Sequence, residues 1–186
     1  MGFWTTAKTG NDPKRNYRFT VQVTGLTANS GVLWMAKSCA KPAYTINATP
    51  HQYLNHTFQF PGKVEWQAIS MVLVDPGGDN DFAKDINKLV QTAGYEIPGA
   101  GTLTTIGKKN LSSTIGNVVI KQLDADGSTV EKWTLMQPIL TSVKFGDLAY
   151  DNENLTEVTL EWRYDWAEFE DADGAAMFKL SAANGS

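Results

Sequence analysis

One stretch near the C-terminal end constrains the fold of this chain more than any other. Residues 157–166 read EVTLEWRYDW, and apolar and polar residues alternate through it. A period of two is typical of a β-strand that buries one face. The apolar residues of the series are Val158, Leu160, Trp162, Tyr164 and Trp166. The segment therefore predicts a strand with a core-facing side and an opposite side that carries Glu157, Glu161 and Asp165.

Shorter apolar segments predict further strands along the chain. Residues 17–23 alternate in the same way, and residues 64–74 begin alternating and become wholly apolar. Two segments flank the turn Asp124-Ala125-Asp126-Gly127 and predict a hairpin. The remaining strand candidates are residues 32–40, 44–49, 58–61 and 139–145.

A single helix is expected at about residues 79–93. The turn cluster DPGGDND precedes it, and Asp79, Asn80 or Asp81 can cap its first turn. Gly94 is a suitable stop. The apolar stripe at helical spacing consists of Phe82, Ile86, Leu89 and Val90.

These elements predict a mainly β fold, an antiparallel β-sandwich or partial barrel with one flanking α-helix. A β-domain is expected over residues 16–166. It includes residues 94–116, which are rich in Gly, Thr and Ser and are expected to form a long loop. Residues 1–15 and 167–186 lack periodicity and are expected to be N-terminal and C-terminal arms.

The charge of the chain is modest overall but unevenly distributed. The formal net charge is -4, which gives no reason to expect general affinity for nucleic acid. Acidic residues gather after residue 146, whereas bases outnumber acids in the first eighty residues. The two parts can attract each other within one molecule or between copies. No apolar run suggests a signal peptide or a membrane helix, so synthesis in the cytoplasm is expected.

The patterns around the chemically reactive residue types indicate ordinary structural roles. His51 and His56 lack the partners and spacing of a metal site. The Asp-rich turns lack the calcium-loop pattern, and Gly99-Ala100-Gly101 lacks the dinucleotide pattern. Cys39 is expected to be a packed thiol. A glycosidase pair among the acids of residues 157–166 is disfavoured, because carboxylates on one strand face are usually solvated. No enzyme activity, cofactor or metal is therefore expected.

Two longer blocks together resemble the tail tube proteins of contractile-tailed bacteriophages. In residues 58–92, a strand with a Trp and a run of aliphatic residues leads through an acidic turn into one amphipathic helix. In residues 133–170, a proline-bearing strand and an acidic turn lead to a last strand that ends in an aromatic and acidic cluster. Residues 16–23 lie where the family has its first strand. The tube proteins of type VI secretion and contractile injection systems are similar in architecture.

The resemblance implies a structural virion protein, a tail tube subunit. Such subunits form stacked hexameric rings, whose sheets join into one inner barrel. The hollow conduit carries DNA and the tape-measure protein inside a contractile sheath, and is driven through the host envelope. The implied partners are further copies of the chain, the sheath protein and a baseplate initiator. DNA passes without specific binding, and the expected location is the virion tail.

Within that picture, the acidic strand face suggests a role in the tube wall. Glu157, Glu161 and Asp165 either face the lumen, where they would repel phosphate, or meet a basic surface of the next subunit. The candidate bases are Lys14, Arg15 and Arg18, and a solvated face that touches nothing is the third possibility. Trp4 is a candidate for docking of the N-terminal arm on its own domain or on a neighbour. Stacking contacts are expected from residues 1–15, 94–116 and 167–186.

Two alternative functions remain open. One is the inner tube of a contractile injection or type VI secretion system, with protein as its cargo. The other is a carbohydrate-binding β-sandwich, which would present exposed coplanar aromatic side chains and remain a monomer.

Overall fold

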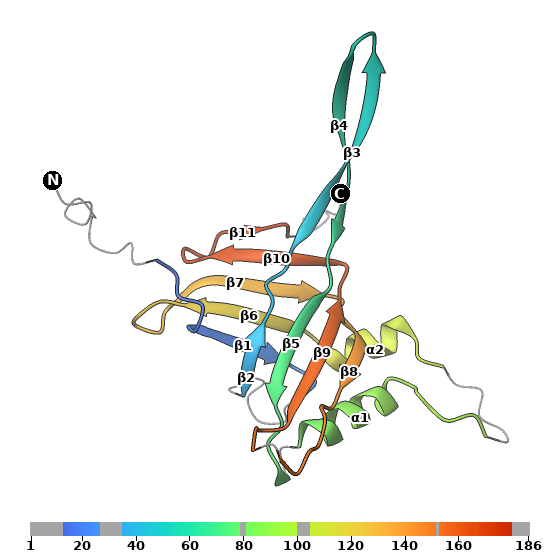
Figure 1. Cartoon of the computed structure of the whole chain (residues 1–186), viewed down its shortest axis with the longest axis vertical. Coiled ribbons are helices and arrows are strands. Elements are labelled where there is room, and N and C mark those ends of the chain that lie inside the picture. The colour runs from blue at the N-terminus through green and yellow to red at the C-terminus, as the bar shows by residue number, and fades with distance from the viewer. Residues whose placement is uncertain (1–12, 27–34, 79–80, 100–104, 152, 180–186) are drawn as a thin grey trace, which may run out of the picture.

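A computed structural model describes residues 13–26, 35–78, 81–99, 105–151 and 153–179 (Figure 1). Within these residues the chain forms three antiparallel sheets and two short helices. The strands are β1 (Phe19–Val23), β2 (Ala36–Cys39), β3 (Tyr44–Tyr53), β4 (His56–Trp66), β5 (Ile69–Val74), β6 (Val118–Leu123), β7 (Thr129–Met136), β8 (Ile139–Lys144), β9 (Glu157–Arg163), β10 (Trp166–Asp171) and β11 (Ala176–Met177). The helices are α1 (Phe82–Thr92) and α2 (Lys108–Ile115).

A five-stranded sheet has the order β1-β6-β7-β10-β11. Its centre is the predicted hairpin, in which β6 and β7 pair antiparallel with Ile120 opposite Trp133. The Asp126 N–H donates to Asp124 Oδ1 at 2.9 Å, and Gly127 takes the left-handed φ of 81° that closes the turn. The turn therefore forms by the local chemistry that its sequence predicts.

A four-stranded sheet has the order β2-β5-β9-β8. Val158, Leu160 and Trp162 of β9 are fully buried, and they lie opposite Leu73, Met71 and Ile69 of β5. The predicted alternation of buried and polar residues is thus confirmed for β9. It gives this sheet one apolar face and one polar outer face.

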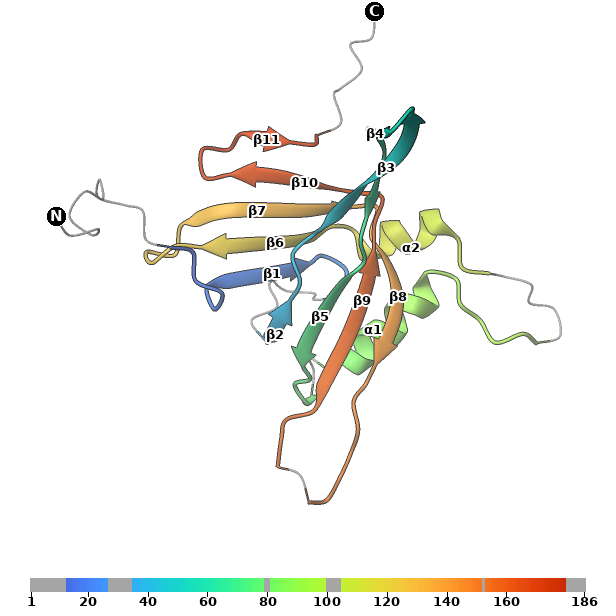
Figure 2. The same ribbon diagram turned by 45° about the horizontal axis from the view of Figure 1, so that its top comes forward.

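The strands of the two larger sheets run across one another in both views (Figures 1 and 2). The buried side chains of both sheets and of α1 form one core, which includes Val21, Leu135, Leu160 and Ile86. The predicted mainly β class with antiparallel sheets is confirmed. The sheets formed by the described residues are open, so the core lies between layers and not inside a closed barrel.

Helix α1 confirms the predicted helix. Asp81 caps it by accepting a hydrogen bond from the Lys84 N–H at 3.0 Å. Phe82, Ile86 and Leu89 are buried, as the apolar stripe predicts. The chain leaves the helix at Gly94, which has a φ of 104°.

The structure corrects the prediction of a long loop at residues 94–116, because α2 occupies its second half. The segment KKNLSSTI has no side-chain cap and several poor helix formers, so its local sequence gave no helix signal. Burial of Leu111 and Ile115 stabilises the helix, and the Ser112 hydroxyl donates to Gln137 Oε1 at 2.8 Å. Tertiary packing, and not the helix propensity of its residues, therefore determines that α2 forms. It also corrects the prediction of one flanking helix to two.

The single strand expected at residues 157–166 is two strands in different sheets. β9 ends at Arg163, Tyr164 and Asp165 turn the corner, and β10 pairs with β7 in the five-stranded sheet. The Asp165 N–H donates to the Met136 carbonyl at 3.1 Å at this corner. A period of two indicates which residues are buried, but it does not indicate which strand is the hydrogen-bonding partner. The change of sheet therefore could not be predicted from the sequence.

The same sheet extends past the expected start of the C-terminal arm. Residues 167–171 belong to β10, and Ala176–Met177 adds a short edge strand. The domain boundaries otherwise remain a prediction. Residues 1–12 of the expected N-terminal arm, and Trp4 with them, lie outside the described residues.

β3 and β4 form a long hairpin that projects beyond the end of the four-stranded sheet (Figure 1). The sequence pattern predicts only fragments of this hairpin, at residues 44–49 and 58–61, and predicts residues 64–74 as one strand. In the structure β4 ends at Trp66 and β5 begins at Ile69. The hairpin was missed because nearly all of its residues are exposed, and burial is what produces a periodic pattern.

Candidate functional site

The polar outer face of the four-stranded sheet carries two of the three predicted site acids. Lys37 Nζ donates to Glu157 Oε1 at 2.5 Å, so this acid has a basic partner in the same chain. Glu161 is exposed and makes no ion pair with another described residue. Its neighbours across the strands are Ser70 and Ser142. Of the acids predicted for this face, Glu161 is therefore the one whose charge stays available.

Asp165 lies elsewhere, at the corner between β9 and β10. Both of its carboxylate oxygens accept hydrogen bonds of 2.7 Å from Lys108 Nζ, at the start of α2. Both side chains are about half exposed, which makes this a surface ion pair of small energetic weight. The structure therefore does not gather the three acids into one site.

The three candidate bases lie near β1, each in a different setting. Lys14 forms an ion pair with Glu131 of β7. The Arg15 carbonyl accepts from Gln122 Nε2 at 3.2 Å, which ties the backbone to β6. The Arg18 guanidinium lies 5.4 Å from the centre of the Tyr17 ring.

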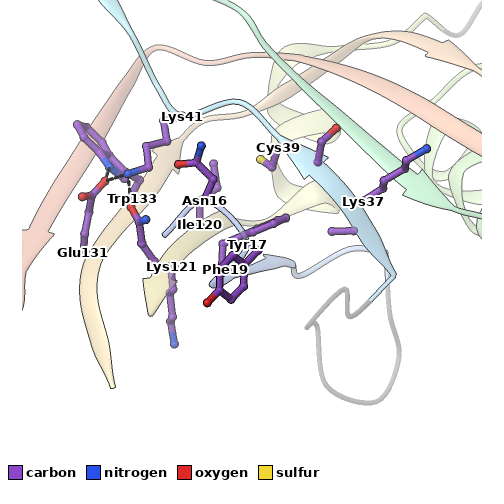
Figure 3. A pocket seen from close by; sticks show the side chains of 13 residues that line it. Asn16, Tyr17, Phe19, Lys37, Cys39, Lys41, Ile120, Lys121, Glu131 and Trp133 are labelled. Atoms are coloured by element: carbon purple, nitrogen blue, oxygen red, sulfur yellow. Dashed lines mark hydrogen bonds and ion pairs between the residues drawn. The ribbon is translucent and has the colours of Figure 1, made fainter. Parts of the chain in front are cut away.

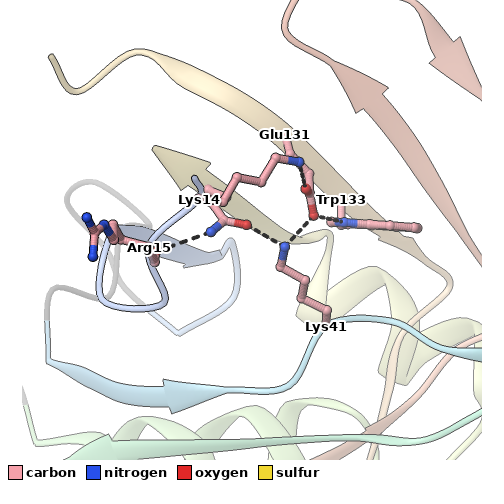
Figure 4. Close-up of polar contacts among 6 residues, drawn as sticks. Lys14, Arg15, Lys41, Glu131 and Trp133 are labelled. Atoms are coloured by element: carbon pink, nitrogen blue, oxygen red, sulfur yellow. Dashed lines mark hydrogen bonds and ion pairs between the residues drawn. The ribbon is translucent and has the colours of Figure 1, made fainter. Parts of the chain in front are cut away.

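A buried carboxylate that the sequence analysis missed organises this region (Figure 4). Glu131 is 6% exposed. It accepts hydrogen bonds from Lys14 Nζ at 2.5 Å, Lys41 Nζ at 2.6 Å and Trp133 Nε1 at 2.7 Å. Its alternation with Trp133 and Leu135 on the inward face of β7 is the signal that could have identified it, because an acid at an apolar-face position needs partners.

Electrostatics explain how Glu131 stays charged there. Burial raises the pKa of its carboxyl, but the hydrogen bonds from Lys14, Lys41 and Trp133 outweigh burial and lower the pKa to about 2. Lys14 precedes β1 and Lys41 lies between β2 and β3. The carboxylate therefore holds the N-terminal segment and the approach to the hairpin against one sheet.

A groove of about 740 Å³ lies beside this ion-pair cluster (Figure 3). Phe19, Cys39 and Trp133 contribute apolar walls, and Lys37 and Lys121 contribute charge. Burial raises the pKa of the Cys39 thiol to about 12, so it stays protonated at neutral pH and is a poor nucleophile.

The outer half of the β3–β4 hairpin presents an aromatic surface to solvent. Cross-strand partners share a face, and the pairs His51–Phe58 and Tyr53–His56 lie on the same face as Phe60. The ring centres of His56 and Phe58 are 4.7 Å apart with planes at 80°. We call His51, Tyr53, His56, Phe58 and Phe60 the aromatic face of the hairpin. His51 and His56, which the sequence did not favour as metal ligands, are thus part of this face.

The inner half of the hairpin is fastened to the body by other aromatic rings. Tyr44 and Trp66 are 5.2 Å apart, and Trp66 also contacts Tyr164 at 5.9 Å between ring centres. Phe178, from the segment after β11, lies 5.9 Å from both hairpin rings. The base of the hairpin is therefore fixed, while its outer half has no support from the described body of the chain.

Two properties of the described residues bear on other kinds of site. They contain no group of three or more His, Cys, Asp or Glu side chains placed to hold a metal ion. None of their helices is long and apolar enough to cross a membrane.

No protein-family model matches the sequence, and no curated protein matches it. Solved structures do match. A chain of the anti-feeding prophage (AFP) baseplate is similar with a TM-score of 0.63 and 15% identity, over 88% of this chain and 99% of that chain. A chain of the AFP tube-terminating cap is similar with a TM-score of 0.63 and 14% identity, over 92% of this chain and 99% of that chain.

A third similar chain comes from the sheath–tube complex of PVC, an extracellular contractile injection system, in its extended state. The TM-score is 0.60 and the identity 13%, over 87% of this chain and 93% of that chain. At such identities the similarity establishes a shared fold. The coverage shows that the fold is shared over nearly the whole length of both chains.

Proposed function

We propose that this chain is a tube subunit of a contractile injection system, which assembles as stacked hexameric rings around a hollow lumen. The observation that carries the proposal is the fold shared with chains of the AFP baseplate, the AFP cap and the PVC sheath–tube complex over 87–92% of this chain. The partners we propose are further copies of the chain, a surrounding sheath and a baseplate initiator.

Open sheet edges support ring formation. The four-stranded sheet ends in β2 on one side and β8 on the other. An unpaired strand edge is a template for pairing with another chain. If the β8 edge of one subunit meets the β2 edge of the next at a fixed rotation, a ring closes and neither of these two edges remains unpaired.

The outer face of the same sheet is the proposed wall of the lumen. It carries hydroxyl groups from Ser70, Ser142 and Thr159, together with the charged side chains of Lys144, Glu161 and Arg163. The Glu157 charge is offset by Lys37. The proposed wall is therefore less acidic than the sequence alone suggested, with Glu161 as its available acid. Contact of Glu161 with a basic surface of a neighbouring subunit is the other possibility.

A phage tail tube is the second candidate, with DNA and a tape-measure protein as its contents. The sequence resemblance of residues 58–92 and 133–170 supports it, whereas the similar solved structures favour the injection-system tube. A carbohydrate-binding module is disfavoured, because the exposed hairpin rings meet edge to face and form no flat stacking platform.

Negative-stain electron microscopy of the purified protein over a concentration series tests the proposal. We expect hollow rings or tubes with six-fold averages, either spontaneously or after preformed tube fragments are added as seeds. Particles that remain monomeric at every concentration with seeds present would refute it.

A further inference from the structure

We infer that Phe178 is a positioning residue, which holds the β3–β4 hairpin at one fixed angle to the body of the free subunit. The inference deepens the proposed function, on which its consequence for assembly rests, by naming what fixes the direction of the projecting element. Three observations carry it: ring contacts at the hairpin base, a strained backbone at Phe178 and a minimal edge strand that leads to this residue.

Two other contacts at the hairpin base leave its angle free. The Gln67 N–H donates to the Ala43 carbonyl at 2.8 Å, but this bond joins the two segments that lead into the hairpin to each other. The Trp66 ring contacts Tyr164 at 5.9 Å between ring centres, at the corner between β9 and β10. One ring contact with the body gives a point of support but does not fix an angle. A second support is therefore needed to set the direction of the hairpin.

Phe178 supplies the second support. Its ring centre lies 5.9 Å from the ring centres of both Tyr44 and Trp66, with interplanar angles of 65° and 89°. Tyr44 and Trp66 are cross-strand partners, one on β3 and one on β4. Edge-to-face contacts at such separations are favourable for aromatic pairs. Because Phe178 contacts one ring from each strand, it opposes rotation of the hairpin as a unit.

The backbone of Phe178 has an unfavourable conformation. Its φ is 59°, in the left-handed region that a bulky side chain rarely adopts. Burial does not explain this conformation, because the side chain is 55% exposed. Such strain persists only where surrounding contacts determine the conformation. We attribute it to the ring contacts with Tyr44 and Trp66.

The short strand before Phe178 brings this residue to the hairpin. β11 pairs with β10 through Ala176 and Met177 only. Asp171 Oδ1 accepts a hydrogen bond from the Ala175 N–H at 2.8 Å, which closes the turn between the two strands. β11 then runs back toward the hairpin in both views (Figures 1 and 2). A two-residue edge strand adds little stability of its own, so its main contribution is the position that it gives to Phe178.

A fixed hairpin direction favours assembly. In a symmetric assembly every subunit presents the same surfaces in the same relative positions. A hairpin that moves freely in the free subunit would lose that freedom on assembly, and this loss lowers affinity. Pre-organisation by Phe178 removes the loss in advance. Phe178 therefore lowers the concentration that assembly requires, without needing to contact a neighbouring subunit.

Distance measurements within single subunits test the inference. In a Cys39→Ala background, Asn55→Cys at the hairpin tip and Lys88→Cys on α1 are exposed and carry spin labels. Labelled protein is diluted with unlabelled protein, so that electron paramagnetic resonance reports the distance between labels within one chain. We expect a single narrow distance distribution, and we expect Phe178→Ala to widen it at least twofold. An unchanged width in F178A would overturn the inference.

Two further variants separate the ring of Phe178 from the strand that carries it. Met177→Ala is the matched control, because Met177 is adjacent in the chain and 52% exposed. Phe178→Tyr keeps an aromatic ring at the same position. We expect both variants to keep the narrow distribution. If either widens it as much as F178A does, the ring contacts are not the cause. Circular dichroism checks that each variant is folded.

Electron microscopy relates the angle of the hairpin to assembly. We expect F178A to raise the concentration needed for tube formation at least tenfold, and M177A to leave it within twofold. Assembly of F178A at the wild-type concentration, in spite of a widened distance distribution, would overturn the link between the hairpin angle and assembly.

The two measurements together distinguish this inference from the proposed function. Wild-type tubes, with a distance distribution that F178A does not widen, would remove the inference and leave the proposed function standing. A distribution that F178A widens, in a protein whose wild type never forms tubes even with seeds, would leave the positioning role standing and remove the proposed function.

Discussion

Lys14 Nζ lies 2.5 Å from Glu131 Oε2, and this ion pair joins two residues that are 117 positions apart in the chain. Lys41 approaches the other oxygen of the same carboxylate at 2.6 Å. One buried acid thus connects the segment before β1, the segment before the hairpin and the centre of the five-stranded sheet. Two distant segments of the chain are held in place by a single group.

Replacing this acid is expected to destabilise the folded chain. Glu131→Gln keeps the size and one acceptor oxygen but loses the charge-assisted hydrogen bonds to two lysines. We expect the free energy of unfolding to fall by about 1.5–3 kcal/mol, measured by urea denaturation. The matched control is Glu170→Gln, which breaks a part-exposed pair with Lys132 and is expected to cost less than about 1 kcal/mol. Equal losses of unfolding free energy in the two variants would show that burial of Glu131 adds nothing to the stability of its ion pairs.

Stability should depend on pH through the same group. The pKa of Glu131 is about 2 in the folded chain, below its ordinary value of 4.5. A lowered pKa gives stability that is complete above 4.5 and is lost as the pH falls toward 2. We expect the difference between the wild type and E131Q to be largest above pH 5 and to shrink between pH 4.5 and pH 2. A difference that stays constant over this range would contradict the assignment.

Helix α2 should depend on its apolar contacts and not on its ion pair. Ile115 is fully buried, so Ile115→Ala is expected to cost about 2–4 kcal/mol. Lys108→Ala breaks the surface pair with Asp165 and is expected to cost about 0.5 kcal/mol or less. Thermal unfolding of the two variants checks the ranking, and the reverse order would mean that the ion pair holds the helix.

Glu161 is expected to matter for assembly and not for the fold. Glu161→Lys breaks no ion pair among the described residues, so we expect the free energy of unfolding to change by less than about 0.5 kcal/mol. In an assembled ring the new base would lie on the same outer face as Arg163 in every subunit. We therefore expect the concentration needed for tube formation to rise at least tenfold at low salt and to recover at high salt.

Asp126→Lys makes the same change of charge on the exposed β6–β7 turn and serves as the control for Glu161→Lys. Light scattering during assembly of the two variants at several salt concentrations provides the measurement. If both variants assemble like the wild type, the outer face is simply solvated, and neither the lumen nor the inter-subunit interpretation of Glu161 holds.

Elements with strong local signals could be predicted from the sequence. The alternation of Val158, Leu160 and Trp162 identified a half-buried strand, and the stripe with an Asp cap identified α1. The Asp-Ala-Asp-Gly turn identified the β6–β7 hairpin. In each case the residues that determine the element lie within a few positions of one another, so one short segment contains all the information needed to predict it.

The candidate site was predictable only in part, because its contacts join distant segments. The outer face of β9 could be predicted from the alternation of its residues. The ion pair with Lys37, which Glu157 makes and Glu161 does not, could not be predicted, because Lys37 and Glu157 are 120 residues apart in the chain. Glu131 was missed because its two lysine partners, Lys14 and Lys41, come from two distant segments of the chain. The hairpin was missed because it buries almost nothing within its own chain.

By itself the sequence determined the local conformations: which residues alternate, where a helix begins, and which turn closes a hairpin. Only the tertiary structure decided that β9 and β10 belong to different sheets, that α2 forms without a cap, and that one acid keeps its charge available while its neighbours are paired. The reason is physical. Local conformation depends on nearby residues, whereas strand partners, burial and charge pairing depend on side chains that folding brings together from distant parts of the chain.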